Sequence, residues 1–190
     1  MSRLIIISFQ VIIFLLFVSC RQTDSNPFKV QKPAKLGKET SISLNKYWIQ
    51  DEHFQIKTYC ERQGWKMSIS PSGLNYMIID SSSSRLDSPN IGDEVILSYD
   101  IRLLDPNQTR CYHSDSNGLA RFKVDQSLVE SGLHEVVTYL GVGDSALVVL
   151  PHYLAHGIAG DNQKIPPLSP VLYFIKLLDC LLYTSPSPRD

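Results

Sequence analysis

Hydrophobic and polar residues alternate most clearly over residues 95–103, VILSYDIRL, where every second residue is apolar. A period of two predicts a β-strand with one buried face and one polar face. Further strand patterns occur at residues 73–80, 122–124, 145–150 and 171–178. The last two stretches are apolar on both faces, which predicts strands that are central or covered.

Two stretches have apolar residues at helical spacing instead. The longer one, residues 44–63, ends before Gly64, which is suited to a helix C-cap. Its apolar face consists of Trp48, Ile49, Ile56, Tyr59 and Cys60, with Glu52 as the exception. The shorter one, residues 132–140, ends before Gly141. A strand-rich chain with one short central helix predicts an α+β fold. Residues 44–72 would form a helical extension, which either packs on its own domain or forms a dimer interface.

The first residues have the pattern of an export signal. An apolar run over residues 4–18 follows Arg3 and is shorter than the roughly 20 residues that span a membrane. It ends in Ser19-Cys20, which resembles a bacterial lipobox. We therefore expect residues 1–19 to be a lipoprotein signal peptide and Cys20 to carry the lipid anchor. A plain secretory signal and an uncleaved anchor are the alternatives.

The expected lipid anchor sets the location of the rest of the chain. Residues 20–43 are polar and contain Pro27 and Pro33, which predicts a tether between the membrane and the domain. We expect a protein of the bacterial envelope that faces the periplasm, with the outer membrane as its site. Several acyl chains on one cysteine would anchor it firmly, whereas a single chain binds only marginally.

The last residues, 180–190, read CLLYTSPSPRD and follow a strand that we expect to end near Leu178. They resemble a translated transposase adapter from a sequencing library, so we expect a non-native tail outside the fold. A Ser/Pro-rich native tail is the alternative.

Composition narrows the class of protein. The hydrophobic content is 43% and the net charge is −1, as in an ordinary globular domain, and basic residues do not cluster. Nucleic acid is therefore not an expected partner. Cys60 and Cys111 either pair in an oxidising periplasm or remain two buried thiols.

One stretch carries a family resemblance. Residues 151–157, PHYLAHG, are followed by Ile-Pro-Pro at 165–167 and by the strand VLYFIKLL at 171–178. This order resembles the C-terminal half of an FKBP-type peptidyl-prolyl isomerase domain. The segments GDE at 92–94 and VESGLHE at 129–135 extend the likeness. The variant with VESGLHE and P-x-x-L-A-x-G is similar to gliding-motility-associated FKBP-type lipoproteins. The resemblance implies an FKBP-like antiparallel β-sheet curled around one short α-helix, over residues 73–179.

The resemblance also implies an activity. Such a protein is a peptidyl-prolyl cis-trans isomerase that binds proline-containing polypeptides, needs no cofactor or metal and is inhibited by FKBP-directed macrolides. It would assist the folding of exported proteins. The residues that the family pattern places at the substrate pocket are Tyr99, Tyr112, His113, Val129, Glu130, Leu133, His156, Ile165, Pro166 and Tyr173.

Three of these positions depart from the family pattern. Leu133 stands where the best-known members have Trp, His113 where they have Asp, and His156 where they have a Tyr that hydrogen-bonds the substrate. Activity would then be weak, or the domain would serve as a chaperone or binding module of an envelope machine. A metal site formed by histidines is a further alternative, because His152 and His156 lie four residues apart.

Overall fold

The computed structural model describes residues 38–81 and 88–182. The predictions for the signal peptide, for Cys20 and for most of the tether lie outside these residues. The chain divides into two units, residues 1–42 and 43–190. The elements are α2 (Lys38–Arg62), β1 (Ser68–Ile69), β2 (Asn75–Asp80), β3 (Glu94–Leu103), β4 (Arg110–His113), α3 (Ser114–Asn117), β5 (Ala120–Lys123), α4 (Ser131–Val137), β6 (Ser145–Leu150), the 3₁₀ turn η2 (His152–Leu154) and β7 (Val171–Leu181).

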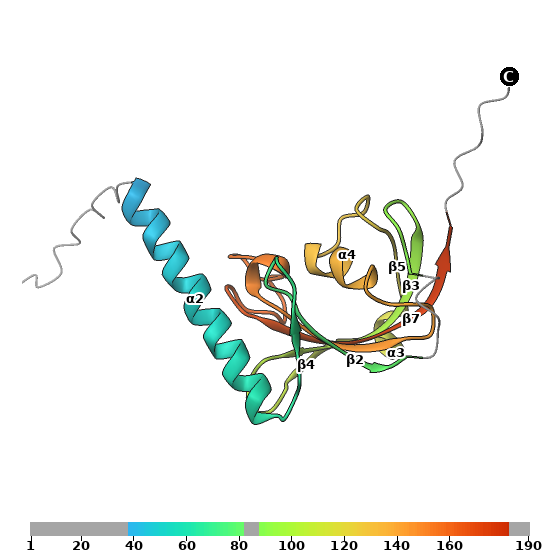
Figure 1. Cartoon of the computed structure of the whole chain (residues 1–190), viewed down its shortest axis with the longest axis horizontal. Coiled ribbons are helices and arrows are strands. Elements are labelled where there is room, and N and C mark those ends of the chain that lie inside the picture. Colours follow the sequence, from blue (N-terminus) through green and yellow to red (C-terminus); the bar gives the residue numbers. More distant parts are fainter. Residues whose placement is uncertain (1–37, 82–87, 183–190) are drawn as a thin grey trace, which may run out of the picture. The chain divides into compact units, whose positions relative to one another are not determined.

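The described strands form one antiparallel sheet in the order β1-β2-β6-β7-β3-β4, with β5 also paired to β3. The long strand β3 makes this possible, because its outer edge pairs with β5 over Glu94–Leu97 and with β4 over Asp100–Arg102. Figure 1 shows α4 lying in the hollow of the curved sheet. This arrangement confirms the predicted α+β fold, an FKBP-like sheet curled around one short helix.

The sheet has apolar side chains on both faces of its central strands. On β6, Ala146, Val148 and Leu150 pack with α4, whereas Leu147 and Val149 pack on the opposite face. Both groups are at most 2% exposed. The unbroken apolar run of β6 is thus explained by burial on two sides, as predicted for a covered strand.

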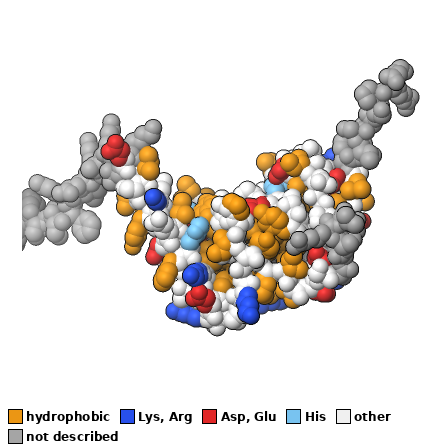
Figure 2. All heavy atoms as spheres, in the orientation of Figure 1, with side chains coloured by type: hydrophobic (Ala, Val, Ile, Leu, Met, Phe, Trp, Pro, Cys, Tyr) orange, Lys and Arg blue, Asp and Glu red, His pale blue; other side chains and the backbone are white. Residues whose placement is uncertain are grey.

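Helix α2 packs on the face of the sheet opposite α4, which we call the second face. Ile56 and Cys60, one helical turn apart, pack against Leu147, Val149 and Leu172. Of the two alternatives for the extension, packing on its own domain is the one observed for this end of the helix. Earlier residues of the predicted apolar face differ, since Trp48 is 53% exposed. Hydrophobic side chains protrude along the helix in Figure 2.

Several element boundaries differ from the sequence predictions. Helix α2 begins at Lys38, so the tether would end before that residue. Strand β7 continues past Leu178 to Leu181, because β3 still offers partners there, with Val95 opposite Cys180. Strands β1 and β4 have only two and four residues, too short for a period to show in the sequence.

Cys60 and Cys111 are free thiols that belong to the cores on opposite faces of the sheet. Burial raises the pKa of both, to about 11 for Cys60, which keeps them protonated near neutral pH. Among the described helices, none combines the length and apolar character that crossing a bilayer requires.

Candidate functional site

A cavity of about 170 Å³ lies between α4 and the concave face of the sheet. Residues of one parity on β3 point into it, because successive side chains of a strand alternate between the faces. Its lining is almost wholly apolar or aromatic and comprises Leu97, Tyr99, Ile101, Ala120, Phe122, Val129, Glu130, Leu133, Tyr173 and Ile175. The volume is below the 300–1,000 Å³ or so of typical drug-sized pockets, so the cavity suits one small ring.

Two tyrosines supply hydroxyl groups to this cavity. Tyr173 is 1% exposed, and its hydroxyl donates to the Glu130 carboxylate at 3.2 Å. Burial first, and then the nearby negative charge of Glu130, raise the pKa of Tyr173 well above its ordinary value. Burial also raises the pKa of Tyr99. Both hydroxyl groups therefore keep their protons at any physiological pH, and that of Tyr173 donates to Glu130.

Glu130 lies where the segment before α4 enters the helix, in an extended conformation with φ −58° and ψ 134°. Its Oε1 atom is 3.1 Å from Nε2 of His156. The two groups are not aligned as a hydrogen bond, and this ring nitrogen is buried. The contact brings the His/Gly-rich segment after β6 to the edge of the cavity.

Tyr112 lies on β4 and binds the loop before β7 instead of lining the cavity. Its hydroxyl donates to the Asp161 carboxylate, whose Oδ1 also accepts from the backbone N–H groups of Lys164 and Ile165 at 2.9 and 2.8 Å. The hydrogen bond from the Tyr112 hydroxyl to Asp161, together with burial, raises the pKa of Tyr112 to about 12. Burial acts to raise the pKa of Asp161, but the hydrogen bonds outweigh it and lower the value to about 2. The group holds the loop that carries Ile165 and Pro166.

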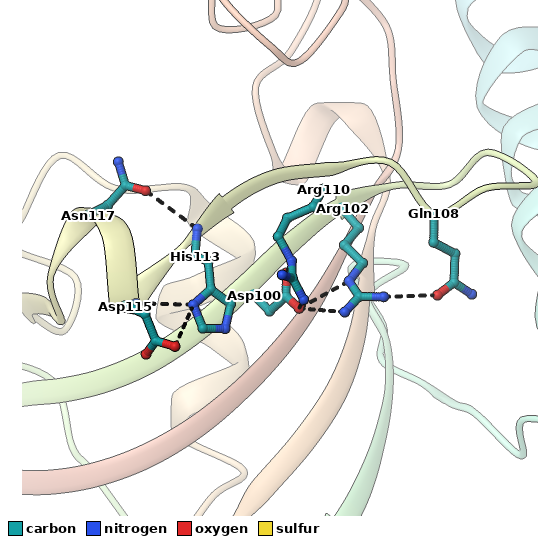
Figure 3. Close-up of polar contacts among 7 residues, drawn as sticks. All are labelled: Asp100, Arg102, Gln108, Arg110, His113, Asp115 and Asn117. Carbon is teal, nitrogen blue, oxygen red and sulfur yellow. Dashed lines mark hydrogen bonds and ion pairs between the residues drawn. The ribbon is translucent and has the colours of Figure 1, made fainter.

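His113 lies on the face of the sheet that points away from the cavity. Its partner across the strand pair is Asp100, and residues directly opposite one another share a face. The Nδ1 atom of His113 accepts from the backbone N–H of Asp115 at 3.1 Å and so caps α3 (Figure 3). The family resemblance predicted His113 for the pocket from its position along the chain. A position along the chain does not show which face of the sheet the side chain occupies.

Asp100 forms a charged cluster with two arginines on this second face. Arg102 donates to its carboxylate at 2.6 and 3.1 Å, and Arg110 at 2.8 and 2.9 Å (Figure 3). Burial acts to raise the pKa of Asp100, but the hydrogen bonds from both arginines outweigh it, so the pKa is lowered. The cluster supports the strand that carries Tyr99 without reaching the cavity.

The predicted pocket residues thus fall into three groups. Tyr99, Val129, Glu130, Leu133 and Tyr173 line the cavity. His156 contacts the lining, and Tyr112, Ile165, Pro166 and His113 lie outside it. Sequence reasoning missed Leu97, Ile101, Ala120, Phe122 and Ile175 as lining residues. Leu97 and Ile101 lie two residues from Tyr99 on β3, and Ile175 lies two residues from Tyr173 on β7. This spacing puts them on the same face of the sheet as the predicted residues, and it is the sequence signal that could have identified them.

The histidines have separate partners. His134 binds the backbone of Asp125 and Ser127, His152 binds Glu52, and His156 approaches Glu130. Among residues 38–81 and 88–182, no three His, Cys, Asp or Glu side chains are grouped so as to hold a metal ion.

Two comparisons with known proteins bear on this domain, a family model and a solved structure. Residues 86–178 match the family model described as FKBP-type peptidyl-prolyl cis-trans isomerase. Among solved structures, this chain is similar to the crystal structure of FkpA from Escherichia coli, with a TM-score of 0.58 and 25% sequence identity. The match covers 75% of this chain and 67% of that chain.

Proposed function

We propose that this chain is a peptidyl-prolyl cis-trans isomerase of the bacterial envelope that assists the folding of exported proteins. The observation that carries the proposal is the small apolar cavity with Tyr99 and Tyr173 on its walls, within a domain of the FKBP type. A proline ring with its preceding amide has the size and polarity that such a cavity accommodates.

The chemistry follows from the electronic structure of the amide. Rotation about an X-Pro bond has a barrier of about 18–20 kcal/mol, and the uncatalysed exchange takes roughly 10–100 s. Twisting the bond removes its resonance and makes the group less dipolar, so an apolar cavity favours the twisted state over the planar one. Preferential binding of that state accelerates the exchange without a nucleophile or a metal.

The polar groups at the edge would orient the substrate. The segment of Val129 and Glu130, which enters α4, is where the family resemblance places a backbone N–H that donates to the ligand. His156 takes the position of the family's tyrosine, and a ring N–H can donate in place of a hydroxyl. Because His156 lies 3.1 Å from the Glu130 carboxylate, we expect substrate binding to compete with this contact.

A proline-isomerisation assay tests the activity. The full chain, kept in solution with mild detergent, is added to peptides that differ in the residue before proline. Acceleration that an FKBP-directed macrolide blocks supports the isomerase. A folded chain that leaves the exchange at its solvent rate refutes it, and would favour the binding module, which then predicts affinity for proline peptides without turnover.

The membrane location is a separate part of the proposal. Its support is the apolar run before Ser19-Cys20, which resembles a lipobox. Expression in a Gram-negative host with radiolabelled palmitate should label the wild type and place it in the membrane fraction. Cys20→Ser should abolish the label, and equal labelling of this variant would contradict the anchor.

A further inference from the structure

Glu52 occupies an unusual position on α2. It is 8% exposed and lies one turn before Ile56 on the row of the helix that faces the sheet. A buried carboxylate is costly unless its oxygens are bound. Both oxygens of Glu52 bind one residue of the turn after β6: Oε1 accepts from the backbone N–H of His152 at 2.8 Å, and Oε2 lies 2.7 Å from its ring Nδ1.

A second contact joins the same helix to the same turn. His53 Nε2 and the Tyr153 hydroxyl lie 2.7 Å apart, and that hydroxyl also lies 3.0 Å from the backbone oxygen of Ser72. Gly73, which has φ +96°, leaves the space for both rings. A Cβ atom there would lie 2.2 Å from the Tyr153 hydroxyl and 2.9 Å from the His53 ring. Two neighbouring residues of α2 therefore hold this turn.

The held turn determines where His156 lies. The backbone oxygen of His152 accepts from the N–H groups of Ala155 and Gly157 at 3.1 and 2.7 Å. These bonds fold residues 152–157 into a compact turn whose first residue is the one bound by Glu52. At its far side, His156 Nε2 meets the Glu130 carboxylate, which lines the cavity.

We propose that Glu52 is a positioning residue for the isomerase site, acting through His152 on His156 and Glu130. The proposal rests on the proposed function. It also extends the working site beyond the family match, which covers residues 86–178 and does not include α2. On this view the helix is part of the catalytic unit and more than a connection to the membrane.

The test is a pair of isosteric substitutions on neighbouring carboxylates of the helix. Glu52→Gln removes the charge that binds His152, whereas Asp51→Asn removes an exposed charge whose partner, Gln55, lies on α2 itself. We expect Glu52→Gln to lower kcat/KM about fivefold, mainly through kcat, and Asp51→Asn to leave it unchanged. If Glu52→Gln folds poorly, His152→Gln replaces it. This variant removes the ring that Glu52 binds, so we expect the same fall in kcat/KM.

A double-mutant cycle with His156→Gln separates positioning from general destabilisation. Residues that act through one another are not additive. If Glu52 acts through His156, Glu52→Gln should cost less than about twofold in the His156→Gln background. An equal fivefold loss in both backgrounds, or an equal loss with Asp51→Asn, would overturn the proposal.

The NMR signals of the His156 ring provide a readout that does not need turnover. Glu52→Gln should shift them, and Asp51→Asn should not. Absence of catalysis in the wild type would refute the proposed function alone, because the ring signals still report whether Glu52 positions His156. Unchanged signals in Glu52→Gln would refute the positioning role alone.

Discussion

Alternate residues of strands β3 and β7 form two different surfaces. One face of these strands lines the cavity, and the other contributes to packing and ion pairs. On the concave face, Tyr99 and Tyr173 surround open apolar space of about 170 Å³. On the other face, Leu172 is covered by α2, and Asp100 is neutralised by two arginines. At these positions the second face is packed and paired, as in a stabilising core. The first face leaves apolar space between aromatic walls that a small ring would fill, and this contrast favours the cavity as the functional side.

The largest expected effect comes from opening a gap in the filled face. Ile56 is fully buried against the sheet, so Ile56→Ala should lower the free energy of unfolding by about 3 kcal/mol, through lost burial and the cavity left behind. Urea unfolding followed by circular dichroism measures this change. Ile49→Ala, on the same helix but 36% exposed, is the matched control and should cost less than about 1 kcal/mol. Equal costs would mean that α2 does not pack as described.

The charged pairing on the same face should have the next largest effect, and it should depend on pH. Asp100→Asn should cost about 1–2 kcal/mol at pH 7, because Arg110 is half exposed and solvent weakens its share. The pKa of Asp100 is lowered in the folded state, so its contribution is complete above the unfolded value of about 3.9 and is lost as the pH falls through the folded value.

Unfolding curves at several pH values test this prediction. The stabilities of wild type and Asp100→Asn should differ by a constant amount above about pH 5 and converge as the pH falls through the lowered folded-state pKa of Asp100. Asp80→Asn, at the exposed end of β2, is the control with little effect at either pH. A difference between wild type and Asp100→Asn that persists in acid would exclude the ion pairs as its source.

On the cavity face, a comparable truncation should change catalysis more than stability. Tyr99→Ala removes part of the wall that favours the twisted amide, and we expect kcat/KM to fall at least tenfold, or about 1.4 kcal/mol of transition-state binding. Tyr99 is already partly exposed, so the midpoint of thermal unfolding should change by only a few degrees. Retained activity in a folded Tyr99→Ala variant would place the reaction elsewhere.

The smallest effect concerns the charge at the cavity edge. Glu130 is the acidic side chain among the residues that line the cavity. Peptides with lysine before proline should therefore be turned over about threefold faster than peptides with glutamate, an electrostatic effect that salt weakens. Glu130→Gln should remove the preference. A preference that survives this substitution would have another origin.

The alternating pattern of residues 95–103 was sufficient to predict β3, and the double-sided apolar runs predicted β6 and β7 as covered strands. The FKBP resemblance then predicted Tyr99, Leu133 and Tyr173 for the substrate pocket, and in the structure these three residues line one cavity. These predictions hold because the periodicity of a strand and its burial are local properties that one chain segment already contains.

The parts that sequence could not supply depend on contacts between distant segments. Glu52 interrupts the apolar face of α2 in sequence, and only the fold brings it to His152, one hundred residues later. The face on which His113 lies follows from its register with Asp100 across β3 and β4. Register is fixed by the whole sheet, so a family pattern read in chain order cannot contain it.

The central claim is that the concave cavity binds and twists prolyl bonds. Its most direct test is an NMR titration of the full chain, with labelled methyl groups on Leu133 and Ile56, by a proline peptide whose cis–trans exchange is recorded in the same sample. We predict accelerated exchange, a saturable shift of the Leu133 methyl signals and an unchanged Ile56 signal. Exchange at the solvent rate, or a peptide-induced shift at Ile56 without one at Leu133, would contradict the claim.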